Sequence, residues 1–313
     1  MSIGITVVIP AHNRGPTLPR AIRSAMDQDL SPAEILVIDD GSTDDTALVV
    51  RTFGDSVKYF YRKHEGVSAA RNAGVEKSAS DWTAFLDSDD YWLPDHLSKI
   101  ALAIASTNGD AACYFSDARY SDDGTETHWN QCRFDIAGAF QLQSDAREWA
   151  LMHTQPMLLP ASVIRKKAYW SVGGLDPNVT TREDTMLFHL LAMQYPLCAV
   201  RNVGLVVTND GEQRLTLADD SRHPVYWTSS ILMYRKILSR VGVNSSYHRR
   251  IIHNRLSDSY SGLAKAHLRA GDFGKAMRSA IAASLASPSH FLMTASARIA
   301  RPWRERHTTS TEP

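Results

Sequence analysis

Strand-like and helix-like patterns alternate along the first 116 residues of the chain. The apolar run Ile5-Thr6-Val7-Val8-Ile9 is typical of a strand that is covered on both faces, and Pro10 closes it. The next segment, 18–26, repeats apolar residues at helical spacing. Further strands are expected at 34–38, 57–61, 82–86 and 111–116, and further helices at 44–53, 68–77 and 95–106. Such alternation predicts an α/β fold, with a mostly parallel sheet and flanking helices.

The regular alternation ends after residue 116. Residues 117–150 are polar and rich in Asp, Ser and Thr, which fits either a loop or a small antiparallel insert. Regular patterns return at 156–164, in a helix that ends at Gly173-Gly174, in a helix at 183–193 and in one or two closing strands at 197–208. Glycine suits the end of a helix because it adopts the left-handed cap conformation without steric cost.

Helical periodicity dominates the chain from about residue 212 onward. Apolar residues recur at helical spacing from Trp227 to Leu238, and the stretch 263–277 resembles two short helices joined at Gly271. One such hairpin is not a solenoid, since about three repeats are needed for independent stability. The sequence therefore predicts a main domain at 1–211, a helical C-terminal region at 212–306 and a flexible tail at 307–313.

Composition excludes several classes of protein. The 34 basic and 34 acidic residues balance, so no global charge indicates binding to nucleic acid. The three cysteines are widely spaced and form no CxxC pair, which argues against a disulfide framework or a structural zinc site. No window offers about 18 uninterrupted apolar residues, so we expect no transmembrane helix. The N-terminus enters a strand without a basic leader, and a cytoplasmic location is expected.

Polar and acidic residues follow three of the predicted strands at the point where each strand ends. The three clusters are Pro10-Ala11-His12-Asn13, Asp39-Asp40-Gly41-Ser42 and Asp87-Ser88-Asp89-Asp90. Carboxyl ends of parallel strands share one edge of a sheet, which is where open α/β folds bind ligands. Carboxylates gathered at one edge repel each other, so a metal ion or another cation would be needed to offset that repulsion.

Each of these signals also has a structural interpretation. The run 87–90 supplies hard oxygen ligands that suit Mg²⁺ or Mn²⁺, ions that partner phosphates; alternatively, it is an Asp-rich turn before the next helix. The segment Gly66–Asn72 opens a helix whose amides and Arg71 could face a phosphate, or it is a tightly packed helix start. Convergence of three clusters on one edge favours the metal and phosphate interpretation.

Four strings together resemble those of the family 2 glycosyltransferases, which have the GT-A fold. They are Val7-Val8-Ile9-Pro10-Ala11-His12-Asn13-Arg14, the run 37–46 (VIDDGSTDDT), Gly66-Val67-Ser68-Ala69-Ala70-Arg71-Asn72-Ala73-Gly74, and Phe85-Leu86-Asp87-Ser88-Asp89-Asp90-Tyr91-Trp92. They occur in the order and spacing of that family, over about residues 3–210. The resemblance implies a Rossmann-like GT-A domain followed by a C-terminal helical extension.

The resemblance also implies a role for individual residues in binding a nucleotide-diphosphate sugar. Pro10 and Ala11 would lie against the nucleoside, Asp40 would accept a hydrogen bond from the base, and Asp39 would support that turn. Arg71 would approach the nucleotide, Asp87 would contact the ribose or the sugar, and Asn13 and Ser88 complete the donor-binding set. Asp89 would be the direct ligand of Mg²⁺ or Mn²⁺ in the DxD motif of the family, here Asp87-Ser88-Asp89.

Transfer to a hydroxyl acceptor requires a base, which the family supplies from an acidic pair at the start of a later helix. The string Thr181-Arg182-Glu183-Asp184-Thr185-Met186 matches that pattern, so Asp184 is the predicted base and Glu183 a positioning neighbour. Acidic residues at a helix N-terminus are also favourable without any catalytic role, by about 0.3–1 kcal/mol each. Gln155 is a candidate contact to the acceptor.

The expected function is inverting transfer of a sugar to a saccharide or lipid-linked acceptor, with a UDP-sugar as the default donor and a role in bacterial-type surface polysaccharide synthesis. The alternative is a nucleotide-sugar-binding module that acts without transfer. Between residues 264 and 306, eight Lys or Arg stand against two acids. The segment 298–306, which includes Trp303, fits peripheral contact with anionic lipid or an ordinary solvated helix end.

Overall fold

The computed structural model describes residues 3–120, 125–208, 223–240 and 246–294. Its residues separate into two compact units: one lies within Met1–Asn178 and Glu183–Glu212, and the other within Val179–Arg182 and Gln213–Pro313. The predicted domain boundaries stay a prediction, and the predicted tail at 307–313 lies outside the described residues.

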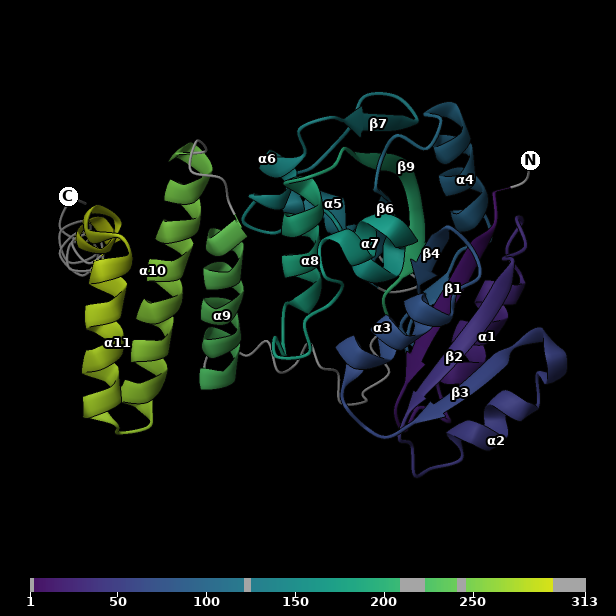
Figure 1. The fold of residues 1–313 in the computed structure, drawn as a ribbon, viewed down its shortest axis with the longest axis horizontal. Helices are drawn as coiled ribbons and strands as arrows, with labels where there is room; N and C mark the ends of the chain where they lie inside the picture. The colour runs from purple at the N-terminus through teal and green to yellow at the C-terminus, as the bar shows by residue number, and fades with distance from the viewer. Residues whose placement is uncertain (1–2, 121–124, 209–222, 241–245, 295–313) are drawn as a thin grey trace, which may run out of the picture. The chain divides into compact units, whose positions relative to one another are not determined.

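The first unit is built around one sheet, whose described strands lie in the order β3-β2-β1-β4-β8-β6-β9-β5, with β7 also pairing with β9 (Figure 1). These strands are β1 (Ile5–Ala11), β2 (Glu34–Asp40), β3 (Lys58–Arg62), β4 (Trp82–Phe85), β5 (Tyr91–Trp92), β6 (Cys113–Arg119), β7 (Phe140–Gln143), β8 (Ser162–Arg165) and β9 (Leu197–Val206). Strands β1 to β4 are mutually parallel, and β6 and β9 run the same way, because β8 is antiparallel to both β4 and β6. The predicted mixed α/β fold with a mostly parallel sheet is confirmed.

Helices flank this sheet, some through one apolar face, as α1 does, whereas α8 is buried all round over Met186–Ala192. They are α1 (Leu18–Met26), α2 (Thr46–Arg51), α3 (Val67–Lys77), α4 (His96–Ser106), α5 (His128–Cys132), α6 (Arg147–Ala150), α7 (Lys166–Ser171) and α8 (Glu183–Ala192), with 3₁₀ turns at Gly54–Ser56 and Leu159–Ala161. Helix α1 buries Leu18, Ala21, Ile22 and Ala25, the spacing predicted from the sequence. Helix α3 approaches β1 closely: a Cβ on Gly74 would lie 2.3 Å from Cγ1 of Val8.

The stretch 117–150 is the part of this unit that the sequence describes least well. Strand β6 runs to Arg119, three residues beyond its predicted end, and a small insert of α5, β7 and α6 follows. Strand β7 pairs antiparallel with β9, so the insert interpretation fits better than a loop. Further along the chain, Gly173 and Gly174 have φ of 92° and 65°, as expected for residues that end helix α7. A single strand, β9, closes the sheet.

The second unit contains the helices α9 (Pro224–Arg240), α10 (Ser246–Arg269) and α11 (Phe273–Ala286). Helix α10 packs closely against α9, since a Cβ on Gly262 would lie 2.3 Å from the Trp227 ring. The break at Gly271, with φ of 76°, is confirmed, but the expectation of two short helices there is wrong for the first, which has 24 residues. Among the described residues, no helix combines the length and the apolar character needed to span a membrane.

Candidate functional site

The carboxyl ends of β1, β2 and β4 lie at one edge of the sheet. Strand β1 pairs in parallel with β2 on one side and β4 on the other, with Ala11 opposite Asp39 and Val8 opposite Phe85. The turns that follow these strands therefore emerge next to one another, as the sequence predicts. Pro10 and Ala11 are buried at the end of β1, and Ala11 is only 3% exposed.

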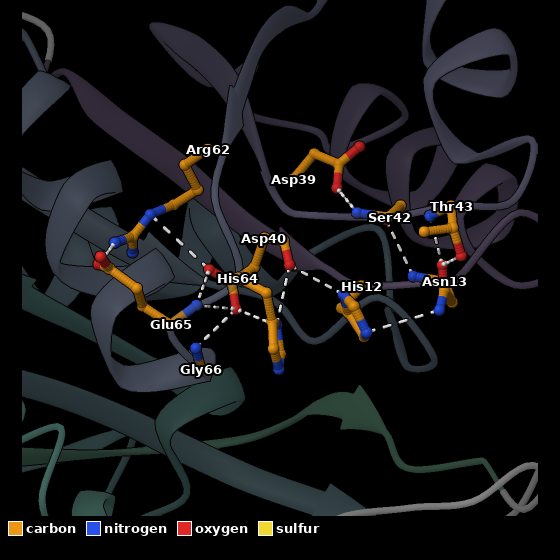
Figure 2. Close-up of polar contacts among 10 residues, drawn as sticks. All are labelled: His12, Asn13, Asp39, Asp40, Ser42, Thr43, Arg62, His64, Glu65 and Gly66. Carbon is orange, nitrogen blue, oxygen red and sulfur yellow. Dashed lines mark hydrogen bonds and ion pairs between the residues drawn. The ribbon is translucent and has the colours of Figure 1, made fainter.

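Asp39 and Asn13 shape the turns that follow β2 and β1 (Figure 2). One carboxylate oxygen of Asp39 accepts the Ser42 amide at 2.8 Å, and the other accepts the Tyr59 hydroxyl at 2.5 Å. Asn13 has φ of 53°; its backbone N–H donates to Ser42 Oγ at 2.9 Å, and its side-chain oxygen accepts the Thr43 amide at 2.8 Å. The hydrogen bonds of Asn13 join the turn after β1 to the turn after β2, and Asp39 itself is buried.

Asp40 lies at the centre of a second cluster, shown in Figure 2. Its carboxylate accepts the amides of Glu65 and Gly66, with Gly66 N at 2.7 Å from Oδ2, and His64 Nδ1 lies 2.8 Å from the same oxygen. Arg62 Nε is 3.7 Å from Oδ1. Gly66 has φ of 94°, a conformation that glycine adopts readily, and it aims its amide at Asp40 where helix α3 begins.

His12 and His64 form a stacked pair beside Asp40. Their ring centroids are 4.2 Å apart, and the Nδ1 atoms of both rings lie within 2.9 Å of the Asp40 backbone oxygen. The His64 side chain is 59% exposed, and His12 is exposed as well. Sequence reasoning assigned no role to His64, because nothing in its local pattern links it to a turn 24 residues earlier.

The acidic turn after β4 is held from several directions. The backbone oxygen of Asp89 accepts hydrogen bonds from Arg20 Nη2 at 2.7 Å and from Thr208 Oγ1 at 2.5 Å, and one carboxylate oxygen lies 3.9 Å from Arg14 Nη2. Asp90 is 3% exposed, and its carboxylate accepts the Thr208 amide, so this residue fastens the turn to the end of β9. Ser88 is also buried, at 6% exposure.

Arg71 joins the acidic turn to the start of helix α8. One guanidinium nitrogen donates to Asp87 Oδ1 at 2.6 Å, and another donates to Glu183 Oε1 at 2.8 Å. Arg71 is 6% exposed. Burial disfavours its charge, but the two carboxylates raise the pKa of Arg71 above its usual value, so the guanidinium remains charged.

Glu183 and Asp184 open helix α8 as a close acidic pair. Burial is the main reason that the pKa of Glu183 rises to about 7, and the neighbouring charge of Asp184 acts in the same direction, while Arg71 opposes both. Asp184 Oδ1 accepts the Thr185 amide at 2.6 Å. An acidic group that titrates near neutrality beside a second carboxylate is a usual arrangement at sites of proton transfer.

The insert places a polar and aromatic cluster next to this pair. Gln155 Nε2 donates to the carbonyls of Ala150, at the end of α6, and Thr185, in the first turn of α8, at 2.8 and 3.4 Å. The backbone oxygen of Gln155 lies 2.8 Å from Nε2 of His128. Burial lowers the pKa of His128, and the Gln155 carbonyl, Asp117 and, least of the three, Asp184 oppose that effect.

The aromatic part of this cluster comes from four rings. Centroid distances are 5.3 Å between Phe134 and Trp149, 4.9 Å between Trp129 and Phe134, and 5.7 Å between Phe115 and Trp149. Trp129 and Phe115 are buried, whereas Phe134 and Trp149 are partly exposed. Phe115 belongs to the predicted strand 111–116, whereas Trp129, Phe134 and Trp149 lie in the irregular stretch 117–150, where periodicity gave no sign of them.

The structure thus brings the predicted residues together in two groups. One contains Asn13, Asp39 and Asp40, and the other contains Arg71, Asp87 and Glu183, with Asp89 in the same turn as Asp87 and Asp184 next to Glu183. Within the part of the chain that the structure describes, no cluster of three or more His, Cys, Asp or Glu side chains is arranged to hold a metal ion.

Relatives of known sequence match the chain over a limited stretch. An uncharacterized glycosyltransferase from Rickettsia conorii is 43% identical over 97 residues, which are 30% of this chain and 16% of that protein. A Campylobacter jejuni protein named GalNAc(5)-diNAcBac-PP-undecaprenol beta-1,3-glucosyltransferase is 36% identical over 101 residues, 31% of this chain and 33% of that protein. The match therefore spans less than half the length of either relative.

Solved structures resemble the chain over most of its length. TarS residues 1–349 from S. aureus, in complex with UDP-GlcNAc, gives a TM-score of 0.65 at 12% identity, covering 89% of this chain and 90% of that one. The mannosyltransferase PcManGT from Pyrobaculum calidifontis, in complex with GDP-Man and Mn²⁺, gives 0.60 at 18% identity, covering 97% and 83%. At such identities the likeness shows the fold, which is GT-A. The model of the family described as Glycosyl transferase family 2 matches residues 6–172, more than half of the chain, and we conclude that the chain belongs to that family.

Proposed function

We propose that this chain transfers a sugar from a nucleotide-diphosphate donor to a hydroxyl of a saccharide or lipid-linked acceptor, with inversion at the anomeric carbon. The observation that carries the proposal is the buried Arg71, which joins the acidic turn after β4 to the acidic pair of α8. The acidic turn after β4 carries groups suited to binding a diphosphate sugar, and the acidic pair of α8 carries groups suited to removing a proton. The complexes of TarS with UDP-GlcNAc and of PcManGT with GDP-Man support a nucleotide-sugar donor.

The donor nucleotide is proposed to lie over the ends of β1 and β2. Asp40 keeps acceptor capacity on Oδ1, because a carboxylate offers about four lone-pair sites: Gly66 and His64 both contact Oδ2, whereas Oδ1 accepts the Glu65 amide at 3.1 Å. The exposed ring of His64 offers a flat face on which a base could stack. Asp39 and Asn13 act indirectly by fixing the turns, whereas Pro10 and Ala11 form the floor. UDP is the default donor nucleotide.

A divalent ion fits the turn at Asp89 if the donor supplies part of its coordination. Mg²⁺ in phosphate-transfer sites is commonly bound through one or two carboxylates together with substrate phosphates, so a three-residue protein cluster is not required. Asp89 would hold the ion, Asp87 in the same turn would contact the ribose or the sugar, and Ser88 would complete the donor contacts there. When bound, Mg²⁺ or Mn²⁺ supplies charge stabilisation for the departing diphosphate.

Asp184 is the proposed base and Glu183 the group that positions it. Inversion by direct displacement requires the acceptor hydroxyl and the departing diphosphate on opposite faces of the sugar. A carboxylate in that position accepts the proton of the attacking hydroxyl. Arg71 holds Glu183 in place, so it maintains the distance between the acidic turn and the start of α8.

The acceptor is proposed to lie against the insert. Phe134 and Trp149 are partly exposed aromatic rings, and Gln155 connects the helix that carries Trp149 to the first turn of α8. Aromatic faces with nearby polar groups are typical of sites that bind amphipathic ligands such as sugars. The name of the Campylobacter relative is compatible with a lipid-linked saccharide and with surface polysaccharide synthesis.

The decisive experiment incubates the full chain with a panel of nucleotide sugars and a divalent ion, and measures thermal stabilisation and release of nucleoside diphosphate. Stabilisation together with diphosphate release that increases on adding a saccharide acceptor supports transfer. Stabilisation with no release, over an acceptor panel that includes lipid-linked saccharides, would favour the alternative of a binding module without transfer. The predicted lipid contact of the segment 298–306 lies outside the described residues and stays a prediction.

A further inference from the structure

Helix α11 carries a row of exposed apolar side chains at a spacing of four residues. The row consists of Phe273, Met277, Ile281 and Leu285, which are 74%, 64%, 53% and 77% exposed. Leu292 and Met293, in the segment after the helix, are 67% and 63% exposed. Single exposed apolar side chains are ordinary, but a continuous row on one helix is typical of a surface that contacts a protein or a membrane.

The other face of α11 is the one that packs within the helical unit. Ala276, Ser279 and Ala283 are buried there, and Ser257 of α10 donates a hydrogen bond of 2.8 Å to the Ala283 carbonyl. The helix therefore places small residues against its neighbour and large apolar residues on the opposite side. In an ordinary amphipathic surface helix the large apolar residues face the core, so this arrangement is reversed.

The described helices of the unit that carries the row are rich in basic residues. The segments 224–240 and 246–294 contain ten Lys or Arg and only two acids, Asp258 and Asp272, although the whole chain is neutral. No acidic residue occurs between Phe273 and Thr294. Lys275 pairs with Asp272 at 2.7 Å, and Arg278 is exposed directly beside Met277 in the helix. The row therefore combines large apolar side chains with an exposed Arg278 and no acid between Phe273 and Thr294.

Charge distinguishes between the two kinds of partner that such an apolar face could contact, a second copy of this chain and a lipid surface. In a symmetric dimer the same patch occurs on both subunits, so Arg278 and its basic neighbours would approach their own copies, and like charges oppose that contact. An anionic lipid surface has the opposite charge and an apolar interior. Each Lys or Arg near such a surface contributes about 1 kcal/mol of attraction.

We propose that the exposed face of α11 lies on an anionic lipid surface, with the Phe273–Leu285 row in the boundary between headgroups and acyl chains and Arg278 among the phosphates. A helix that lies in the plane of the interface buries its apolar face about 5–10 Å deep, which suits a row of four large side chains. The contact attaches the helical unit to the membrane surface without crossing it. It goes beyond the proposed transfer reaction and does not depend on it.

Flotation of the full chain with lipid vesicles tests this inference. Vesicles of phosphatidylcholine with phosphatidylglycerol are compared with phosphatidylcholine alone, at low and high salt. Wild type is expected to bind the anionic vesicles and to lose binding at high salt. The Met277→Glu/Ile281→Glu variant is expected to lose at least about tenfold in binding, and Arg278→Gln about fivefold, since 1 kcal/mol corresponds to about that factor.

The matched control is Leu48→Glu/Leu102→Glu, which places two charges at exposed apolar positions in the other unit, where the side chains are 62% and 59% exposed. It should bind vesicles as wild type does, and all variants keep residues 295–313 unchanged. Circular dichroism checks folding, and Met277→Ser/Ile281→Ser replaces the double Glu variant if that variant unfolds. Vesicle binding that survives the α11 substitutions, or that is lost equally in the control, overturns the inference. So does a wild type that ignores vesicles but forms a dimer that the α11 variant dissolves.

Discussion

Arg71 donates a hydrogen bond of 2.8 Å to Glu183, although 112 residues separate the two in the chain. The same guanidinium contacts Asp87, so one side chain holds the end of a central strand and the start of helix α8. Because the Arg71 and Glu183 side chains are only 7% and 13% exposed, water compensates poorly for either partner when the other is removed.

Replacing Arg71 by Met should destabilise the fold by roughly 3–5 kcal/mol at pH 8, because it leaves Glu183 as an uncompensated buried charge. The loss should be smaller at pH 6, where Glu183, whose pKa is already raised to about 7, takes up a proton. Urea denaturation at the two pH values measures both effects. As a control, Arg147→Met breaks an exposed pair with Asp145 and should change stability by less than about 1 kcal/mol. Equal losses in the two variants would contradict the prediction.

Glu183 should impose a pH dependence on turnover. Its carboxylate is protonated below about pH 7, which weakens its bond to Arg71, so kcat/KM should fall as the pH decreases through that value. Glu183→Gln imitates the protonated form at every pH. We therefore expect this variant to show low activity with a flat profile between pH 6 and 8. A wild-type limb near pH 7 that persists unchanged in Glu183→Gln would assign the limb to another group.

Asp184 and Asp89 should give opposite patterns of loss. Asp184→Asn removes the proposed base and should reduce kcat by at least about 100-fold, with nucleotide affinity close to that of wild type. Asp89→Ala should instead weaken the binding of the nucleoside diphosphate and abolish its dependence on Mn²⁺. Calorimetric titration with and without the ion, together with initial rates, separates the two. Normal turnover in Asp184→Asn, or unchanged metal dependence in Asp89→Ala, would reject the respective role.

The sequence predicts the parts of this molecule that depend on short-range pattern. The helix Leu18–Met26 and the strand Glu34–Asp40 follow from apolar periodicity, and their order places three strand ends on one edge. Arg71 was identified by its motif, but its bridge to Glu183 depends on how α3 and α8 meet in space. No local pattern encodes a contact over 112 residues.

The ring packing in the insert and the exposed row on α11 are two further features that sequence patterns do not predict. Phe134 and Trp149 lie in a stretch without periodicity, so no local pattern predicts that their rings pack together. The row on α11 has helical spacing, and spacing alone predicts a buried face; the structure shows that Ala276 and Ala283 occupy that face instead. Small residues allow close packing against the neighbouring helix. Because they occupy the buried face of α11, its large apolar residues are exposed.

Replacing Trp149 should weaken the binding of the acceptor and leave the binding of the donor nearly unchanged. Its ring lies 5.3 Å from Phe134 and is partly exposed, on a helix whose last residue is connected by Gln155 to the first turn of α8. Trp149→Ala should therefore raise the KM of the acceptor by about tenfold or more, the scale expected for loss of an aromatic contact, while the KM of the donor stays within about twofold. Initial rates with each substrate varied in turn measure the two constants.

Trp170→Ala is the matched control, because it removes an indole that is 40% exposed from α7, outside the insert, and should leave both constants near those of wild type. A rise in the donor KM, or an equal effect in the control, would indicate general loosening of the fold, and the acceptor would then have to be sought at another face of the domain.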